Sequence, residues 1–86
     1  MKKLYPSVKF VKTNGFYDQL KHVYSEVKEV TDEIDGSLED LLMEICDLEH
    51  SIQTAFEIVE KKFGADIDAI RARVVEKNRK RGYYEG

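Results

Sequence analysis

The sequence predicts an all-α protein in which an antiparallel helical hairpin is joined by a third helix. Three observations favour this fold class: apolar residues recur at helical spacing over two long stretches, a glycine-containing break separates the stretches, and the chain has a single proline. The 86 residues suffice for one domain, and a domain of this size buries only about 60% of its unfolded surface. We therefore expect oligomerisation to complete a four-helix-type bundle.

Residues 1–13 are expected to form an extended N-terminal arm. Pro6 disfavours a helix, and Val8 and Phe10 alternate with polar residues in the manner of a strand. A single short strand has no partner in an otherwise helical chain. We therefore expect the arm to pack on the helices or on a neighbouring chain.

The first helix is predicted over about residues 14–35. Its apolar positions follow one another at intervals of 4, 3, 4, 3 and 4 residues, which is a sustained helical period. These positions are Phe16, Leu20, Val23, Val27, Val30 and Ile34. The segment DGS (35–37) then breaks the pattern and is expected to form a tight turn.

Two further helices follow the turn. Ser37 is a suitable N-cap for the second helix and Gly64 a suitable residue to end it, so this helix is predicted over residues 38–63. Asp66 is the expected cap of the third helix, which ends in a basic run before Gly82. Residues 14–82 are therefore expected to form the helical domain, and residues 83–86 a C-terminal tail.

Charge and composition narrow the classes of function. The chain has 14 basic and 17 acidic residues and a net charge of −3, which gives no reason to expect binding of a nucleic acid polymer. No stretch approaches the roughly 20 apolar residues that a membrane span needs, so no membrane association is expected. The lone Cys46 favours a reducing, cytoplasmic setting. Acidic residues dominate the middle of the chain, whereas residues 71–81 are strongly basic.

Two acidic pairs occur at helical spacing on the two arms of the predicted hairpin. Glu26 and Glu29 are three residues apart, as are Glu44 and Asp47, and residues three apart share a helix face. The first pair lies ten and seven residues before Gly36, and the second lies eight and eleven after it. Residues at similar distances from the turn face each other, so Glu29 is expected beside Glu44 and Glu26 beside Asp47. Four carboxylates grouped in this way are unfavourable without a counter-ion. Oxygen ligands without histidine or thiol select Mg²⁺, with Mn²⁺ as a substitute, over zinc.

An ordinary solvated face is the alternative interpretation of these carboxylates. A mostly helical chain with 17 acidic residues is expected to contain such pairs by chance, and Glu57 and Glu60 form another. Asp47 also points away from the apolar axis of its helix, as a solvated residue would. The main argument for a metal site is that the two acidic pairs lie at similar distances from the turn of the hairpin.

Three segments resemble the MazG-like all-α nucleoside triphosphate pyrophosphohydrolases: K-x-x-x-x-E-V-K-E-V (21–30), L-x-E-I-C-D-L (42–48) and V-V-E-K-N-R-K-R-G-Y-Y (74–84). The resemblance covers about residues 15–84. It implies a helical enzyme that works as a homo-oligomer, a dimer or a tetramer. It also implies Mg²⁺-dependent hydrolysis of a nucleoside triphosphate, (d)NTP, between the α and β phosphates, which gives monophosphate and pyrophosphate.

The same resemblance implies roles for particular residues. The four metal ligands would be Glu26, Glu29, Glu44 and Asp47. A carboxylate that lies just outside the metal ligands, or that holds the metal weakly, can take the proton of the attacking water, and from this chemistry, not from the resemblance, we expect Glu29 to be the catalytic residue. The substrate-binding residues, which would hold the triphosphate, would be Lys77, Asn78 and Arg81, with Lys21 as a further candidate.

The sequence departs from the family pattern in three ways, and only the third leaves the preferred base open. Cys46 stands where relatives often have glycine, and Met43 where many have another acid. No signature for recognition of the base can be assigned. Phosphoribosyl-ATP pyrophosphohydrolase shares the fold, although the basic tail fits the first group better. A non-catalytic helical interaction protein is the alternative from another class; it would use its acidic faces for solubility and its basic tail for a partner.

Overall fold

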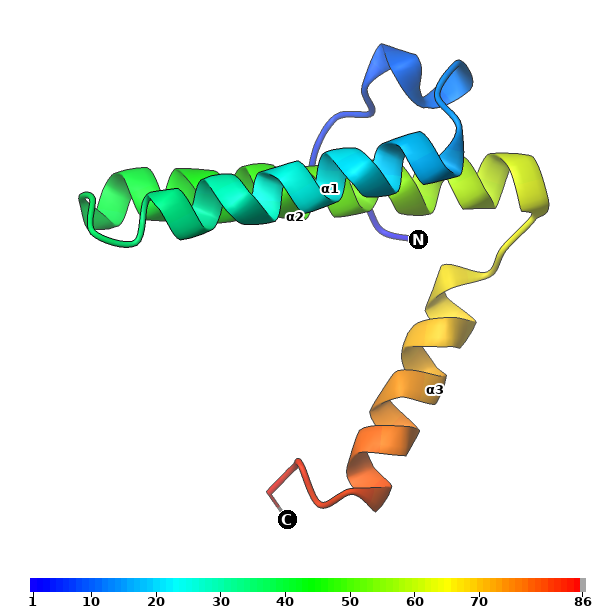
Figure 1. Cartoon of the computed structure of the whole chain (residues 1–86). Helices are drawn as coiled ribbons and strands as arrows, with labels where there is room; N and C mark the ends of the chain where they lie inside the picture. The colour runs from blue at the N-terminus through cyan, green and yellow to red at the C-terminus, as the bar shows by residue number, and fades with distance from the viewer. Residues whose placement is uncertain (86) are drawn as a thin grey trace.

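The computed structural model describes residues 1–85, and within this range the protein is helical and has no strand. Helices α1 (Phe16–Asp32) and α2 (Leu38–Phe63) lie side by side as an antiparallel hairpin (Figure 1). Helix α3 (Ile67–Lys80) follows α2, and a short 3₁₀ helix, η1 (Lys9–Lys12), precedes α1. The predicted all-α class and the hairpin with a third helix are confirmed.

The ends of α2 and α3 are set by their capping residues. Ser37 Oγ accepts a hydrogen bond from the backbone N–H of Asp40 at 3.1 Å, and Gly64 ends α2 with φ of 63°, in the left-handed region. The carboxylate of Asp66 accepts from the N–H of Ala69 at 3.0 Å and so begins α3. These caps are the ones that the sequence predicts, and α2 spans 38–63 as expected.

Helix α1 is shorter than predicted at both ends. Its N-terminal end starts later because the backbone N–H of Asn14 donates to Phe10 O at 2.8 Å and so belongs to the turn that closes η1. Its C-terminal end tightens before the connection to α2, where Ile34 N donates to Thr31 O and Gly36 N to Glu33 O. The helix therefore covers 16–32 rather than 14–35.

The strand-like interpretation of the arm is wrong. The N–H of Val11 donates to Val8 O at 3.3 Å, and residues 9–12 turn into η1, which buries Val11 at 2% exposure. A lone strand would leave its backbone groups without partners, whereas the turn pairs some of them internally. The alternation of Val8 and Phe10 was therefore a misleading signal for this segment.

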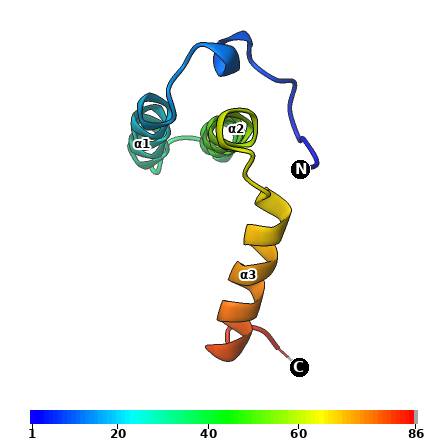
Figure 2. The ribbon, with the colours of Figure 1, turned by 90° about the vertical axis from the view of Figure 1, so that its right-hand side faces the viewer.

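The arm packs on α2 of its own chain, one of the two places expected for it. Gln53 holds it: its Oε1 accepts from the N–H groups of Leu4 and Tyr5 at 2.8 and 3.0 Å, and its Nε2 donates to Tyr5 O at 2.9 Å. The Tyr5 ring stacks on His50 with centroids 4.7 Å apart. Seen along the hairpin, the arm passes over α1 and α2 (Figure 2).

Helix α3 runs away from the hairpin (Figures 1 and 2). Ile67 at its start is buried, but Ile70, Val74 and Val75 are 48, 44 and 41% exposed. Helix α3 therefore covers apolar residues of the hairpin only near its start, where Arg71 also lies over the ring of Phe56, 5.2 Å from its centroid. The apolar stripe of the hairpin leaves exposed side chains, among them Val27, Ile34, Leu38, Leu42 and Ile45.

No helix within residues 1–85 is long and apolar enough to cross a membrane.

Candidate metal centre

The hairpin brings three carboxylates from its two helices to one place. Glu26 of α1 and Glu44 and Asp47 of α2 each offer an oxygen, and these oxygens lie within 4.8 Å of one another. Ligands on opposite sides of Mg²⁺ are about 4 Å apart, because each Mg–O bond is about 2.0–2.1 Å long. The oxygens of this carboxylate cluster (Glu26, Glu44 and Asp47) are thus at or slightly beyond the spacing that the ion requires. The residues present therefore fit a hard divalent cation.

Two oxygens of the carboxylate cluster are buried without a hydrogen-bond partner among residues 1–85: Glu26 Oε2 and Glu44 Oε2. The other oxygen of Glu26 lies 3.2 Å from His22 Nε2, and the Glu26 side chain is only 13% exposed. A buried polar atom that lacks a partner costs about 1–3 kcal/mol, and more when it is charged. A cation bound between the carboxylates would remove this cost.

The surroundings of Glu26 and Glu44 make their carboxyl groups harder to ionise. Burial raises the pKa of Glu26, and the neighbouring Glu29 raises it further, whereas the nearby His22 acts in the opposite direction. Burial also raises the pKa of Glu44, followed by the negative charges of Glu29 and Asp47. Like charges in a partly desolvated site disfavour ionisation, which is the physical cause in both cases.

The fourth predicted ligand, Glu29, lies next to the cluster but is not one of its three converging residues. It is exposed on α1, and it is a neighbour of both Glu26 and Glu44, since it contributes to the raised pKa of each. Its carboxylate is therefore available beside the cluster without being fully engaged in it.

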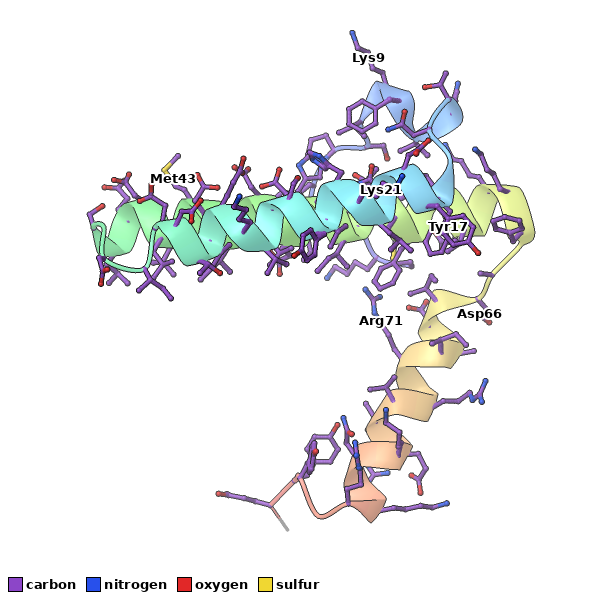
Figure 3. The ribbon with its side chains drawn as sticks, in the orientation of Figure 1. Lys9, Tyr17, Lys21, Met43, Asp66 and Arg71 are labelled. Atoms are coloured by element: carbon purple, nitrogen blue, oxygen red, sulfur yellow. The ribbon has the colours of Figure 1, made fainter. Side chains whose placement is uncertain are left out.

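The predicted phosphate-binding residues lie elsewhere in the chain. Lys77, Asn78 and Arg81 are on and just after the last turn of α3, which points away from the hairpin, so a single chain does not bring them to the carboxylates (Figure 1). Arg81 lies over the ring of Tyr83, 5.4 Å from its centroid. Lys21 is exposed on α1, five residues before Glu26 (Figure 3).

A polar hollow of about 210 Å³ adjoins the carboxylate cluster. Two members of the cluster form part of its wall, and η1 with the residue before it forms another part. Its lining residues are Val8, Phe10, Gln19, His22, Glu26, Asp47, His50, Ser51 and Thr54. The candidate site therefore consists of the carboxylate cluster and an adjoining polar hollow.

Sequence reasoning missed the buried polar residues of this hollow. Gln19 is 1% exposed and donates from Nε2 to Ser51 O and Oγ at 3.0 and 3.1 Å, and Ser51 and Thr54 are 6 and 3% exposed. Each looks like a surface residue in the helical pattern, because it lies outside the apolar stripe. The arm buries them, and its fold was not predicted.

No family model, curated protein or solved structure matches the chain. The resemblance to the MazG-like enzymes therefore rests on the three sequence segments alone. The chemistry of the site rests on its own geometry: three converging carboxylates, two of their oxygens buried and without partners, and a polar hollow beside them.

Proposed function

We propose that the protein is a Mg²⁺-dependent nucleotide pyrophosphohydrolase that cleaves (d)NTPs between the α and β phosphates to monophosphate and pyrophosphate. The observation that carries this proposal is the carboxylate cluster of Glu26, Glu44 and Asp47 within 4.8 Å. A triphosphate is a polyanion and does not approach three carboxylates unless a cation lies between them. A metal-bound polyphosphate is therefore the substrate class that suits this site.

Glu26, Glu44 and Asp47 would hold the ion, and Glu29 would complete the set of carboxylates around it. Bound Mg²⁺, or Mn²⁺ in its place, supplies charge neutralisation of the phosphate oxygens and makes a bound water more acidic. This assignment is supported by two oxygens of the carboxylate cluster that are buried without a hydrogen-bond partner among residues 1–85, because a bound cation would give them a partner.

Glu29 is the residue that we assign as catalytic base. It is exposed beside the cluster, whereas the other three carboxylates converge on one another. An exposed carboxylate can reach a water molecule and accept its proton while the water oxygen bonds to phosphorus and the bond to the bridging oxygen breaks. Pyrophosphate then leaves.

A homo-oligomer, a dimer or a tetramer, is part of the proposal. Helix α3 has 14 residues and leaves Ile70, Val74 and Val75 exposed, and an unsupported helix of about this length is marginal in water. A second copy packed on these residues and on the exposed stripe of the hairpin would complete a four-helix-type bundle. Such packing would also allow the basic segment 77–81 of one copy to lie near the acidic cluster of another, where opposite charges attract.

The test is release of pyrophosphate from a panel of canonical and modified (d)NTPs with Mg²⁺. The wild-type chain is compared with Glu44→Gln, and Glu39→Gln is the matched control because Glu39 is an exposed acid of the same helix outside the cluster. Activity in wild type and Glu39→Gln, but not in Glu44→Gln, is the expected result. No pyrophosphate from any nucleotide would refute the proposal.

The exposed apolar surface also favours a second candidate, a non-catalytic helical interaction protein. In that case Glu26→Gln or Asp47→Asn would leave the stability unchanged or raised, with or without Mg²⁺. The related enzyme option is tested by including phosphoribosyl-ATP in the panel. Hydrolysis of that compound alone would assign the chain to a phosphoribosyl-ATP pyrophosphohydrolase-like activity.

A further inference from the structure

The polar hollow is placed to receive the end of a nucleotide that is remote from the metal. Glu26 and Asp47 belong both to the carboxylate cluster and to the wall of the hollow, so a ligand whose phosphates lie at the cluster has the hollow directly beside it. The volume of about 210 Å³ is below the roughly 300–1,000 Å³ of pockets that enclose whole drug-sized ligands. It is therefore suited to one ring system rather than to a complete nucleotide.

The hydrogen-bonding capacity of the wall consists mainly of acceptors. Gln19 Nε2 already donates to Ser51 O and Oγ, which leaves Gln19 Oε1 as a buried acceptor with no partner among residues 1–85. The hydroxyl of Thr54 donates to His50 O at 3.1 Å, so its remaining capacity is to accept. Glu26 and Asp47 add carboxylate oxygens.

His50 follows the same pattern. Its Nε2 lies 3.1 Å from Pro6 O, and a carbonyl oxygen only accepts, so Nε2 carries the proton. In the neutral ring the other nitrogen, Nδ1, is then an acceptor. His22 also lines the hollow; its Nε2 lies 3.2 Å from Glu26 Oε1, and an ionised carboxylate only accepts, so Nδ1 of the neutral ring is an acceptor too. The hydroxyl of Ser51 is then the donor that the lining retains, and Val8 and Phe10 supply apolar contact from the arm.

We propose that this hollow binds the base of the nucleotide and prefers cytosine or adenine, through the N4 or N6 amino group, over the analogues with a carbonyl oxygen at that position. Cytosine presents an N4 amino donor and adenine an N6 amino donor, whereas uracil and hypoxanthine have carbonyl acceptors at the equivalent positions. Acceptors in the wall can bind the amino group. A carbonyl oxygen in the same place would face other acceptors and could not form a hydrogen bond with them. A site of this kind discriminates strongly, because the wrong base leaves buried polar groups unpaired. The assignment of the ligand as a nucleotide rests on the proposed function.

Nucleoside binding without metal tests the hollow independently of catalysis. The full chain, with chelator present, is titrated with adenosine, inosine, cytidine and uridine, and chemical shifts of backbone amides are followed by NMR. We expect adenosine to bind at least tenfold more tightly than inosine, and cytidine at least tenfold more tightly than uridine. The shifts should centre on residues 8–10, 19–22 and 50–54. Equal affinities within both pairs, or shifts centred on other residues, would overturn the inference.

A pair of valine variants identifies the contribution of the wall. Thr54→Val removes one acceptor of the hollow, and we expect it to reduce the preference for adenosine over inosine by about threefold or more. Thr31→Val is the matched control, since Thr31 is an exposed helical threonine whose hydroxyl donates to Val27 O, four residues back, as that of Thr54 does to His50 O. An equal effect of both substitutions would contradict a role for the hollow.

The two proposals fail separately. Pyrophosphate release with no preference between the paired nucleosides would leave the proposed function standing and overturn the assignment of the hollow. Preferential adenosine binding without release of pyrophosphate from any (d)NTP would support the base site and refute the hydrolase.

Discussion

Glu26 of α1 and Asp47 of α2 are far apart in the sequence, yet each places a carboxylate oxygen in one cluster within 4.8 Å, together with Glu44. Burial and Glu29 raise the pKa of Glu26, and Asp47 adds to the effect. The hairpin register thus holds negative charges together in a partly desolvated place. Such an arrangement destabilises the metal-free fold and becomes favourable when a cation is bound.

Mg²⁺ should raise the Tm of the wild-type chain, and the increase should depend on the cluster. An ion at about 100 times its Kd stabilises the fold by about 2.7 kcal/mol, and each 1 kcal/mol shifts the Tm of a domain this small by about 4–8 °C. Glu26→Gln and Glu44→Gln should each lose most of this increase, whereas Glu39→Gln retains it. Calorimetry with and without Mg²⁺ measures it. Equal Mg²⁺ effects in all four proteins would contradict the metal site.

The stability of the metal-free protein should depend on pH in a defined direction. The pKa values of Glu26 and Glu44 are raised above the 4.5 of the free side chain, so the folded state keeps protons that the unfolded chain releases. Below pH 4.5 these carboxyl groups are protonated in both the folded and the unfolded chain. As the pH rises from 4.5 to the raised pKa values, the free energy of unfolding falls. Above the raised pKa values the free energy of unfolding stays at this lower level. The cluster therefore destabilises the fold at neutral pH.

Glu26→Gln isolates this effect. In chelator, the variant should be more stable than the wild type at about pH 7, and the difference should shrink toward about pH 4, where the wild-type carboxyl is protonated. Urea unfolding at the two pH values measures both free energies. A variant that is less stable than wild type at neutral pH would show that Glu26 is held by favourable contacts instead.

Gln53→Ala should release the N-terminal arm while the hairpin stays folded. The substitution removes the acceptor of the Leu4 and Tyr5 amides and the donor to Tyr5 O. Hydrogen exchange of these two amides should become much faster, and the loss of stability should be about 1–3 kcal/mol because partly buried partners are left unpaired. Unchanged protection of Leu4 and Tyr5, with slow exchange in α2 as well, would show that Gln53 does not hold the arm.

Val74→Glu should disrupt the homo-oligomer without unfolding the hairpin. Val74 is 44% exposed on α3, and a carboxylate there opposes burial against a second copy. Sedimentation should show a dimer or tetramer for the wild type and a smaller species for the variant. Ala69→Glu, which adds the same charge at an exposed position of the same helix outside segment 77–81, is the control. A wild-type protein that is monomeric at all concentrations would contradict the proposed assembly.

The parts of the fold that the sequence predicted are those determined by local chemistry. Ser37, Gly64 and Asp66 end or begin their helices through hydrogen bonds and backbone angles that each residue type favours, so the ends of α2 and α3 were predictable. The register of the hairpin follows from the turn near Gly36, so the approach of Glu26 to Asp47 was also predictable.

The arm and the polar hollow depend on contacts distant in sequence. Gln53 binds the arm across 48 residues of sequence, and nothing in the helical period distinguishes it from a surface glutamine. Gln19 is 1% exposed, with Ser51 of α2 as its hydrogen-bond partner and Val8 and Phe10 of the arm lining the same hollow. A polar residue outside the apolar stripe is expected to be exposed when only the helical period is considered. A single chain also does not bring Lys77 and Arg81 to the carboxylates, and their predicted role requires a second copy.

The most direct test of the central claim is the identity of the products formed from (d)NTPs with Mg²⁺, followed by phosphorus NMR. We predict monophosphate and pyrophosphate in equal amounts from wild type and Glu39→Gln. The rate should be at least about 100-fold lower in Glu44→Gln, since even the loss of residues that support metal ligands costs 10–100-fold. Release of single phosphate, or equal rates in Glu44→Gln and wild type, would contradict the central claim.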